Sequence, residues 1–277
     1  MRVIDGRAIA ADITVGVTSI VTELTAVGIS PTLAMVVPTA DEATAWYVRS
    51  IERAAARLGI GCRVDRISEP DVDAITGHLD RLSADPAVHG IICQTPLPYG
   101  VNLDVVGAHI DPAKDVDGAN PVSLGRLAAG LPTYPPATAG AVVETLRREA
   151  VPLAGRRVVV VGRSTVVGKP AALLLLAEHA TVTVCHSKTA DLAAVCAEAD
   201  VLVAAVGRPH LLGAAHIKPG AVVIDVGTNP TDDGGLAGDV DPHGAAAAAA
   251  LTPVPGGIGP VTTALLMAHT VDAAARR

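Results

Sequence analysis

The stretch that decides the fold runs from residue 157 to residue 170 and consists of RVVVVGRSTVVGKP. A run of strand composition, Arg157 to Val161, is followed by a glycine-led turn and by the start of a helix. Glycine lets the backbone approach an anion, and the N–H groups of a helix start can bind that anion. Pro170 suits a first helical turn, which needs no donor of its own. The stretch therefore predicts a Rossmann-type unit with a phosphate-binding turn.

The turn differs from the best-known nucleotide motifs. Five residues separate Gly162 from Gly168 where a P-loop has four, and Pro170 replaces the Ser or Thr that would hold magnesium. The GxGxxG pattern is not matched either. We therefore predict no metal site, and on this stretch alone a turn that binds no ligand is an equal alternative.

The end of the next predicted strand favours one cofactor over another. It consists of Cys185, His186, Ser187, Lys188 and Thr189. An NAD site usually has an acidic residue about 20 residues after the glycines, whereas cationic or hydroxyl groups there suit NADP. No carboxylate ends this strand, and Arg163 adds a positive group in the turn. The pattern favours NADP, with an ordinary polar strand end as the alternative.

Outward from this unit, strand-length apolar runs alternate with helical periodicity through all 277 residues, which predicts a parallel α/β architecture. A chain of this length predicts two domains at about 100 to 200 residues each. A helix is expected near residues 7–27, a short helix at the alanines 245–250, and a Gly- and Pro-rich loop between two helices at 253–262. Strands are expected at 32–37, 62–67, 90–93, 157–161, 181–185, 201–206 and 221–226.

Composition excludes several classes of protein. Apolar residues make up 50% and charged residues 18%, which predicts an ordered chain. The net charge of −7, the absence of a basic block and the 1% aromatic content argue against nucleic-acid binding. Four cysteines without a CxxC pair favour a reducing cytoplasm. Charged residues interrupt the apolar N-terminus, and glycines and prolines break the uncharged stretch 242–271, so we expect neither export nor a membrane span.

Polar residues of the first half follow predicted elements. Gln94 comes directly after the strand 90–93, at the carboxyl end where open α/β sheets place their ligands. Asp117 precedes Gly118, and a lone Asp-Gly pair is more often only a turn. The loop 253–262 is suited to closing over a ligand, or equally to serving as a stiff connection.

Together these motifs resemble the methylenetetrahydrofolate dehydrogenase/cyclohydrolase family over nearly the whole chain. The resemblance implies two α/β domains around a cleft. A folate-binding catalytic domain would span residues 1–140, with a C-terminal helix at 261–277 packing back onto it, and a Rossmann-type NADP-binding domain would span 141–260. The residues that carry the resemblance are Tyr47-Val48, Gln94 to Pro98, Lys114 to Gly118, Gly162 to Ser164 with Gly168 and Pro170, Cys185 to Ser187, Asp225 to Gly227, Gly238 to Val240 and Pro253 to Thr262.

The resemblance also implies an activity and a set of site residues. The activity is NADP-dependent oxidation of 5,10-methylenetetrahydrofolate to 5,10-methenyltetrahydrofolate, followed by hydrolysis to 10-formyltetrahydrofolate, in a cytoplasmic homodimer. Tyr47 would contact the pterin, Gln94 would support the catalytic group and Asp117 would hold the pterin ring. The loop with Pro255, Gly256 and Gly257 would bind substrate near the nicotinamide. The cofactor residues would be Gly162, Arg163, Ser164, Gly168, His186, Ser187 and Thr228.

One departure from the family pattern concerns the acid–base group. The family's catalytic lysine lies four residues after the motif's tyrosine, and this chain has Ile51 there. An alkyl group cannot move a proton, and the guanidinium groups of Arg49 and Arg53 stay protonated. Hydride transfer chiefly needs alignment, whereas hydrolysis needs an activated water. We therefore predict a dehydrogenase with weak or absent cyclohydrolase activity. The alternatives are a relative that acts on another one-carbon or pterin-like substrate, and a catalytically silent NADP-binding protein.

Overall fold

The computed structural model describes residues 1–231 and 233–276, and the chain divides into two compact units. Unit 1 consists of Met1–Ala10 and Thr138–Thr262, and unit 2 consists of Ala11–Ala137 and Thr263–Arg277. Each unit has its own parallel sheet, which confirms the predicted α/β fold class. Arg277, the last residue of the predicted C-terminal helix, lies outside the described residues.

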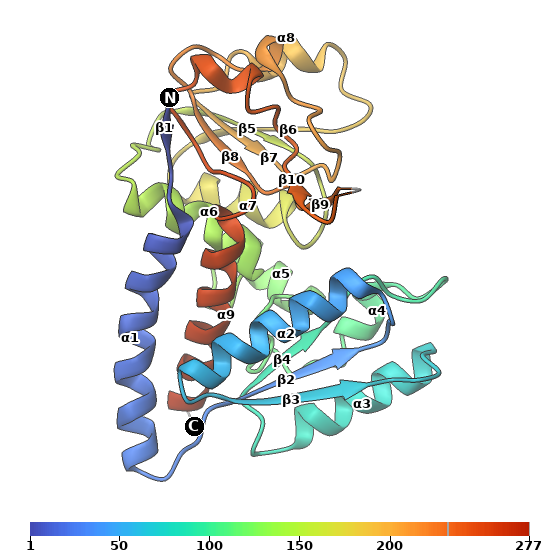
Figure 1. Ribbon diagram of the computed structural model, residues 1–277. Coiled ribbons are helices and arrows are strands. Elements are labelled where there is room, and N and C mark those ends of the chain that lie inside the picture. The colour runs from blue at the N-terminus through green and yellow to red at the C-terminus, as the bar shows by residue number, and fades with distance from the viewer. Residues whose placement is uncertain (232, 277) are drawn as a thin grey trace. The chain divides into compact units, whose positions relative to one another are not determined.

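Unit 1 is built on a six-stranded parallel sheet with the strand order β1-β11-β8-β7-β5-β6 (Figure 1). The central strands consist mainly of valine, isoleucine and leucine, because both faces of a parallel sheet are covered. The core contains Val159, Leu202 and Val223, all at most 3% exposed. The strands are β1 (Arg2–Val3), β5 (Arg157–Val161), β6 (Thr181–Cys185), β7 (Val201–Ala204), β8 (Val222–Asp225) and β11 (Ala250–Leu251).

The other elements of unit 1 connect these strands. A small antiparallel pair, β9 (Asn229–Pro230) with β10 (Leu236–Ala237), follows β8. The helices are α6 (Ala137–Arg148), α7 (Gly168–Ala177), α8 (Leu192–Cys196) and the 3₁₀ turns η1 (Ala214–His216) and η2 (Gly244–Ala247).

Unit 2 contains the three-stranded parallel sheet β3-β2-β4. Its core includes Val36, Leu79 and Ile91, which have no exposed surface. The strands are β2 (Thr32–Val37), β3 (Gly61–Arg66) and β4 (Gly90–Cys93). The helices are α1 (Gly6–Ala26), α2 (Glu42–Arg57), α3 (Val72–Ala84), α4 (Leu103–Gly107), α5 (Pro121–Ala128) and most of α9 (Ile258–Ala275).

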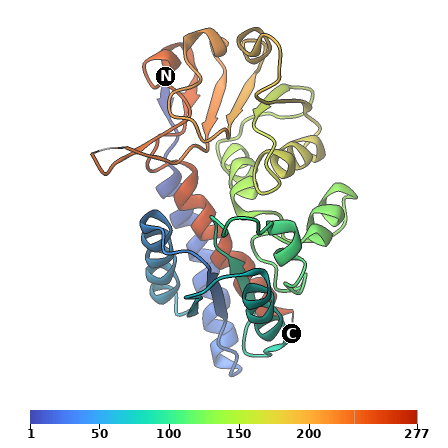
Figure 2. The same ribbon diagram turned by 90° about the vertical axis from the view of Figure 1, so that its right-hand side faces the viewer.

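Helix α1 is, among the described residues, the one helix long and apolar enough to cross a membrane by length and composition. Its residues Ile13, Val17, Val21 and Leu24 are buried and recur every three or four positions. That spacing forms an apolar stripe along one side of the helix, as in an amphipathic helix of a folded core. Figures 1 and 2 both show the lower part of α1 (blue) beside α9 (red).

All seven predicted strands are present, and four of them have the predicted bounds. Three other expectations need correction. The sequence predicts a first domain of residues 1–140, whereas residues 1–10 belong to unit 1, where β1 pairs with β11. The predicted loop 253–262 is shorter than expected, because α9 begins at Ile258. Pro260 lies in the first turn of this helix, where a proline is tolerated. The alanines 245–250 form the end of a 3₁₀ turn and part of β11 rather than one helix.

The four cysteines are free thiols, and Cys93, Cys185 and Cys196 are buried in the two cores. Burial raises the pKa of Cys93 to about 12 and that of Cys196 to about 12. These side chains therefore remain neutral and pack as small apolar groups.

Candidate active site

The glycine-led turn after β5 depends on the lack of side chains at two positions. Gly162 has φ of +128°, and a Cβ atom there would lie 2.0 Å from the carbonyl oxygen of Ala205. A Cβ atom on Gly168, the first residue of α7, would lie 2.2 Å from the carbonyl oxygen of Gly162. Both contacts are too short for any other residue. In this turn the main chains of β5, α7 and the loop after β7 approach one another so closely that only glycine fits at the two positions.

Ser164 organises the start of α7. Its Oγ atom accepts hydrogen bonds from the N–H groups of Val167 at 3.1 Å and Gly168 at 3.4 Å. Its carbonyl oxygen accepts a hydrogen bond from the backbone N–H of Lys169 at 3.0 Å. The side chains of Arg163 and Ser164 are exposed. A guanidinium, a hydroxyl and the positive end of a helix dipole therefore occur together, which is a suitable arrangement for phosphate oxygens.

The end of β6 lies next to this turn, because β5 and β6 are paired with Val161 opposite Cys185. His186 donates its N–H to Thr189 Oγ1 at 2.9 Å, and its Nδ1 accepts from the N–H of Lys188 at 3.1 Å. The side chains of Ser187 and Lys188 are exposed. The structure thus brings the predicted residues Arg163, His186 and Ser187 to the same end of two neighbouring strands.

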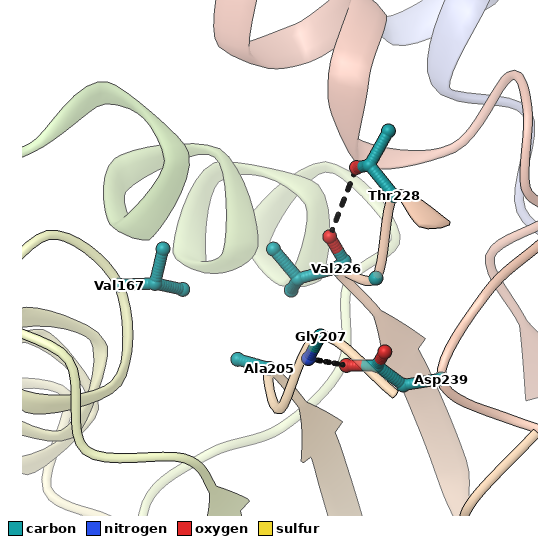
Figure 3. Close-up of a pocket in the computed structure, with 7 residues that line it drawn as sticks. Val167, Ala205, Gly207, Val226, Thr228 and Asp239 are labelled. Atoms are coloured by element: carbon teal, nitrogen blue, oxygen red, sulfur yellow. Dashed lines mark hydrogen bonds between the residues drawn. The ribbon is translucent and has the colours of Figure 1, made fainter. Parts of the chain in front are cut away.

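A pocket of about 150 Å³ opens in unit 1 near these strand ends (Figure 3). The loops that follow β7 and β8 and the residue before α7 form its wall. Of the predicted cofactor residues, Thr228 lines this pocket, and its hydroxyl donates to the carbonyl oxygen of Val226 at 3.4 Å. The lining residues are Val167, Ala205, Gly207, Val226, Gly227, Thr228 and Asp239.

Asp239 holds one side of the pocket in place. Its buried carboxylate accepts the N–H groups of three successive residues, Val206 at 2.6 Å, Gly207 at 3.0 Å and Arg208 at 2.9 Å. Asn229 Nδ2 donates to it at 3.0 Å. Successive N–H groups that converge in this way form an anion-binding concavity, and here the chain fills it with its own carboxylate. The loop after β7 is thereby fixed to Asp239 and, through its carboxylate, to Asn229.

Asp225, at the end of β8, holds the other side. Its carboxylate accepts N–H groups from Gly227 at 2.9 Å, Asp239 at 3.0 Å and Val240 at 2.9 Å. Burial raises the pKa of Asp225 to about 6, against the opposing effect of the three donors. Sequence reasoning assigned no role to Asp225 or Asp239. The detectable signal is an Asp-x-Gly at a buried strand end, at residues 225–227, followed by a Gly-Asp pair at residues 238–239.

The Pro- and Gly-rich loop of unit 1 packs against the start of the chain. Gly6 donates its N–H to Gly256 O at 3.0 Å, and a Cβ on Gly6 would lie 1.7 Å from the carbonyl oxygen of Gly257. Gly256 has φ of +105°, and the Val254–Pro255 peptide bond is cis. Pro255, Gly256 and Gly257 thus form a tightly shaped turn directly before α9.

In unit 2, α2 and the loop after β4 bring predicted residues together. Asp41 caps α2 by accepting the N–H of Thr44 at 2.8 Å, and Thr44 Oγ1 donates to Thr95 O at 3.1 Å. Gln94 is 5% exposed, and its Nε2 atom donates to Met35 Sδ at 3.7 Å. Because sulfur is a weak acceptor, this amide keeps the capacity to bind a better partner.

Asp117 and Tyr47 share a half-buried region of unit 2. Asp117 accepts the N–H of Ala137 at 3.2 Å, while burial and the nearby charge of Asp115 raise its pKa to about 7. Burial and the negative charge of Asp117 also raise the pKa of Tyr47. Gly118, with φ of +62°, lies so close to Pro136 that a Cβ would be 2.5 Å from its nitrogen. A carboxyl group poised near neutral pH therefore lies beside a phenol.

No lysine of unit 2 is available to this region. Ile51 has no exposed surface and is packed in the interior. Of the four lysines in the sequence, only Lys114 belongs to unit 2. Its Nζ atom donates to the carbonyl oxygens of Leu82 at 3.1 Å, Ser83 at 2.6 Å and Asp85 at 2.7 Å. Lys114 therefore closes the C-terminal end of α3 and cannot replace the missing amine without breaking these bonds.

The predicted site residues fall into two groups. Tyr47, Gln94 and Asp117 belong to unit 2, together with Ile51. Gly162, Arg163, Ser164, Gly168, His186, Ser187 and Thr228 belong to unit 1, as do Pro255, Gly256 and Gly257. Unit 1 has the parallel sheet, the glycine turn and the strand-end pocket of a Rossmann-type nucleotide-binding domain.

Comparison with known proteins gives the same result for both units. Residues 4–117 match the model of the tetrahydrofolate dehydrogenase/cyclohydrolase catalytic domain, and residues 136–277 match that of the NAD(P)-binding domain of the same family. The bifunctional protein FolD of Parafrankia sp. (strain EAN1pec) is 63% identical over 99% of both chains. The chain therefore belongs to the tetrahydrofolate dehydrogenase/cyclohydrolase family.

Solved structures agree with this assignment. The FolD methylenetetrahydrofolate dehydrogenase/cyclohydrolase of Campylobacter jejuni superposes with a TM-score of 0.96 at 35% identity, covering 100% of this chain and 99% of the other. The Trypanosoma brucei enzyme, solved with NADP and an inhibitor, has a TM-score of 0.93 at 38% identity, with 99% and 97% coverage. The chain resembles both proteins along 99% or more of its length.

The raised pKa of Asp117 predicts a pH-dependent stability. A folded-state pKa of about 7, above the ordinary value of 3.8, means that folding favours the protonated carboxyl. The stabilising contribution is complete below about pH 4 and is lost as the pH rises through about 7. Asp117→Asn stays neutral and can still accept from Ala137, so its melting temperature should exceed that of wild type increasingly between pH 5 and pH 8. A difference that stays constant over this range would contradict the assignment.

Proposed function

We propose that this protein oxidises 5,10-methylenetetrahydrofolate to 5,10-methenyltetrahydrofolate with NADP⁺. One observation carries the proposal for this member of the family. The Gly162–Ser164 turn lies beside the end of β6, at residues 185–189, which has hydroxyl and cationic groups and no carboxylate. NADP⁺ supplies the hydride acceptor when it is bound.

The residues of unit 1 fit this cofactor. The absence of side chains at Gly162 and Gly168 gives a phosphate close access to main chain. Arg163 provides a guanidinium for the 2′-phosphate, and Ser164 and Ser187 provide hydroxyls for phosphate oxygens, with His186 beside them. Thr228 and the pocket braced by Asp225 and Asp239 would hold the nicotinamide end. Because both aspartates bind several N–H groups each, this pocket is formed before the cofactor arrives.

The residues of unit 2 would hold the folate. The Asp117 carboxylate can accept paired hydrogen bonds from the amino and ring N–H groups of a pterin, which fixes the face of the ring. Tyr47 would contact the pterin, and the Gln94 amide would exchange its weak bond to sulfur for a substrate atom. The turn of Pro255, Gly256 and Gly257 would contact substrate beside the nicotinamide.

The cofactor proposal is tested by Arg163→Ser. Loss of a charge-assisted hydrogen bond costs about 1.5–3 kcal/mol, so the KM for NADP⁺ should rise about tenfold or more. The KM for NAD⁺, which has no 2′-phosphate, should change less than about threefold and serves as the control within the same variant. Steady-state reduction of each cofactor with methylenetetrahydrofolate gives both values. Equal effects on both cofactors would contradict the assigned role, and no turnover by the wild type would contradict the function.

We further propose that hydrolysis of the methenyl product is weak or absent. That step needs an activated water and a group that moves protons, which typically contributes about 10²- to 10⁴-fold. Ile51 supplies no such group, and Lys114 is engaged by three carbonyl oxygens. The methenyl product would then leave as the main product of turnover.

Ile51→Lys tests this interpretation. An amine at this position should increase hydrolysis of methenyltetrahydrofolate at least about tenfold and change oxidation less than about threefold. Ile51→Met, which also replaces a buried branched chain by an unbranched one, controls for repacking. Melting temperatures of both variants identify a folding failure. A folded Ile51→Lys protein with no gain in hydrolysis over Ile51→Met would contradict the role given to this position.

We also propose a cytoplasmic homodimer. In the described part of unit 2, the outer edge of β3 has no strand partner. Beside it the exposed face of α2 carries Trp46 and a hollow of about 530 Å³ lined by Arg49, Glu52, Arg53 and Ala56. A free strand edge next to an exposed aromatic side chain suits a second copy of the chain. Sedimentation equilibrium should give twice the mass of one chain, and a monomer mass would contradict the dimer.

A further inference from the structure

The second half of α9 and the residue that directly follows the helix carry three polar side chains, those of His269, Asp272 and Arg276. Their spacing of three and four residues places them on one face of the helix. All three side chains interact with Tyr134 or with the segment before Asp117. We call these three residues the α9 stripe.

The α9 stripe holds the proline-containing segment of residues 131–136 through Tyr134. The Tyr134 hydroxyl donates to Asp272 Oδ2 at 2.7 Å. The guanidinium of Arg276 lies 5.3 Å from the centre of the Tyr134 ring and pairs with Asp272 at 2.7 Å. The His269 ring lies 5.1 Å from the Tyr134 ring at an interplanar angle of 37°. Hydrogen bonding, cation–π attraction and ring packing therefore fix one tyrosine from several directions.

The same stripe holds the segment before Asp117. His269 Nδ1 lies 2.8 Å from the carbonyl oxygen of Val116. Since a carbonyl oxygen only accepts, the hydrogen must be on Nδ1. Burial lowers the pKa of His269, so the ring is neutral with its hydrogen on that nitrogen.

The two segments that the α9 stripe holds, around Val116 and Tyr134, both adjoin the Asp117 carboxyl. Val116 precedes Asp117 directly, and Tyr134 is followed by Pro136, which presses on Gly118, and by Ala137, whose N–H binds Asp117. Each segment has an anchor on α9, through His269 on one side and Asp272 on the other. Displacement of either segment would move the carboxyl or its donor.

We propose that the α9 stripe positions the Asp117 carboxylate for the pterin, with His269 and Tyr134 as positioning residues for folate binding. The inference rests on the proposed function, because it takes Asp117 as the group that binds the pterin. Neither residue touches the substrate in this account. Their loss should therefore weaken folate binding and leave cofactor binding and the hydride step nearly unchanged.

His269→Leu and His269→Asn form the first test. Leucine removes the donor to Val116, whereas the asparagine amide can place an N–H group near the former Nδ1 position. We expect His269→Leu to raise the KM for methylenetetrahydrofolate about fivefold to twentyfold, with kcat and the KM for NADP⁺ within about twofold. His269→Asn should recover most of the loss. Calorimetric titration with folic acid, without cofactor or turnover, should show the same order of Kd values.

Tyr134→Phe forms the second test, because it removes the bond to Asp272 and keeps the ring. Its expected effect is a KM increase for the folate of about threefold to tenfold. Tyr99→Phe is the matched control, since Tyr99 is fully exposed and should give wild-type values. Melting temperatures of each variant separate a folding defect from a positioning effect.

Some outcomes would overturn the inference. One is an active wild type whose folate KM and folic acid Kd do not change in His269→Leu and Tyr134→Phe. Another is an equal rise in both KM values, which would indicate general loosening. A wild type that does not oxidise methylenetetrahydrofolate would instead overturn the proposed function.

Discussion

The half-buried Asp117 carboxyl beside Tyr47, in a unit whose single lysine is engaged elsewhere, is the constraint from which the chemistry of this chain follows. The carboxyl has the Ala137 N–H as a donor and a pKa of about 7. It can therefore orient a ligand that offers N–H groups, at a pH where it is partly ionised. Because no lysine amine of unit 2 is available to activate water, we infer that this chain retains substrate orientation and hydride transfer better than it retains hydrolysis of the methenyl product.

Unit 1 uses carboxylates in a different way. Asp225 and Asp239 bind backbone N–H groups, so their charge shapes loops and is not offered to a ligand. The glycines at 162 and 168 contribute by having no side chain, and the side chains of Arg163 and Ser164 beside them are exposed to an incoming phosphate. Rigid loops with exposed polar groups give a preformed site, which lowers the ordering cost of binding.

The sequence predicts individual strands and helices well. It predicts contacts between segments that are far apart in the chain poorly. Runs such as RVVVV at 157–161 have enough β-branched residues to predict a strand, whereas β1 and β11 have two residues each and leave no pattern. The positions of Arg163, His186 and Ser187 follow from the order of two adjacent strands. The roles of Lys114 and Asp239 could not be predicted, because each binds backbone about 30 residues away. Helical spacing relates Ile51 to Tyr47, but only packing shows that Ile51 is fully buried.

The central claim is tested most directly by adding 5,10-methenyltetrahydrofolate to the wild-type protein at neutral pH without NADP⁺ and following the loss of its absorbance. We predict a rate close to that of buffer alone at every protein concentration. A rate that rises in proportion to protein and exceeds the buffer rate a hundredfold would show that another group activates water. It would contradict the separation of oxidation from hydrolysis.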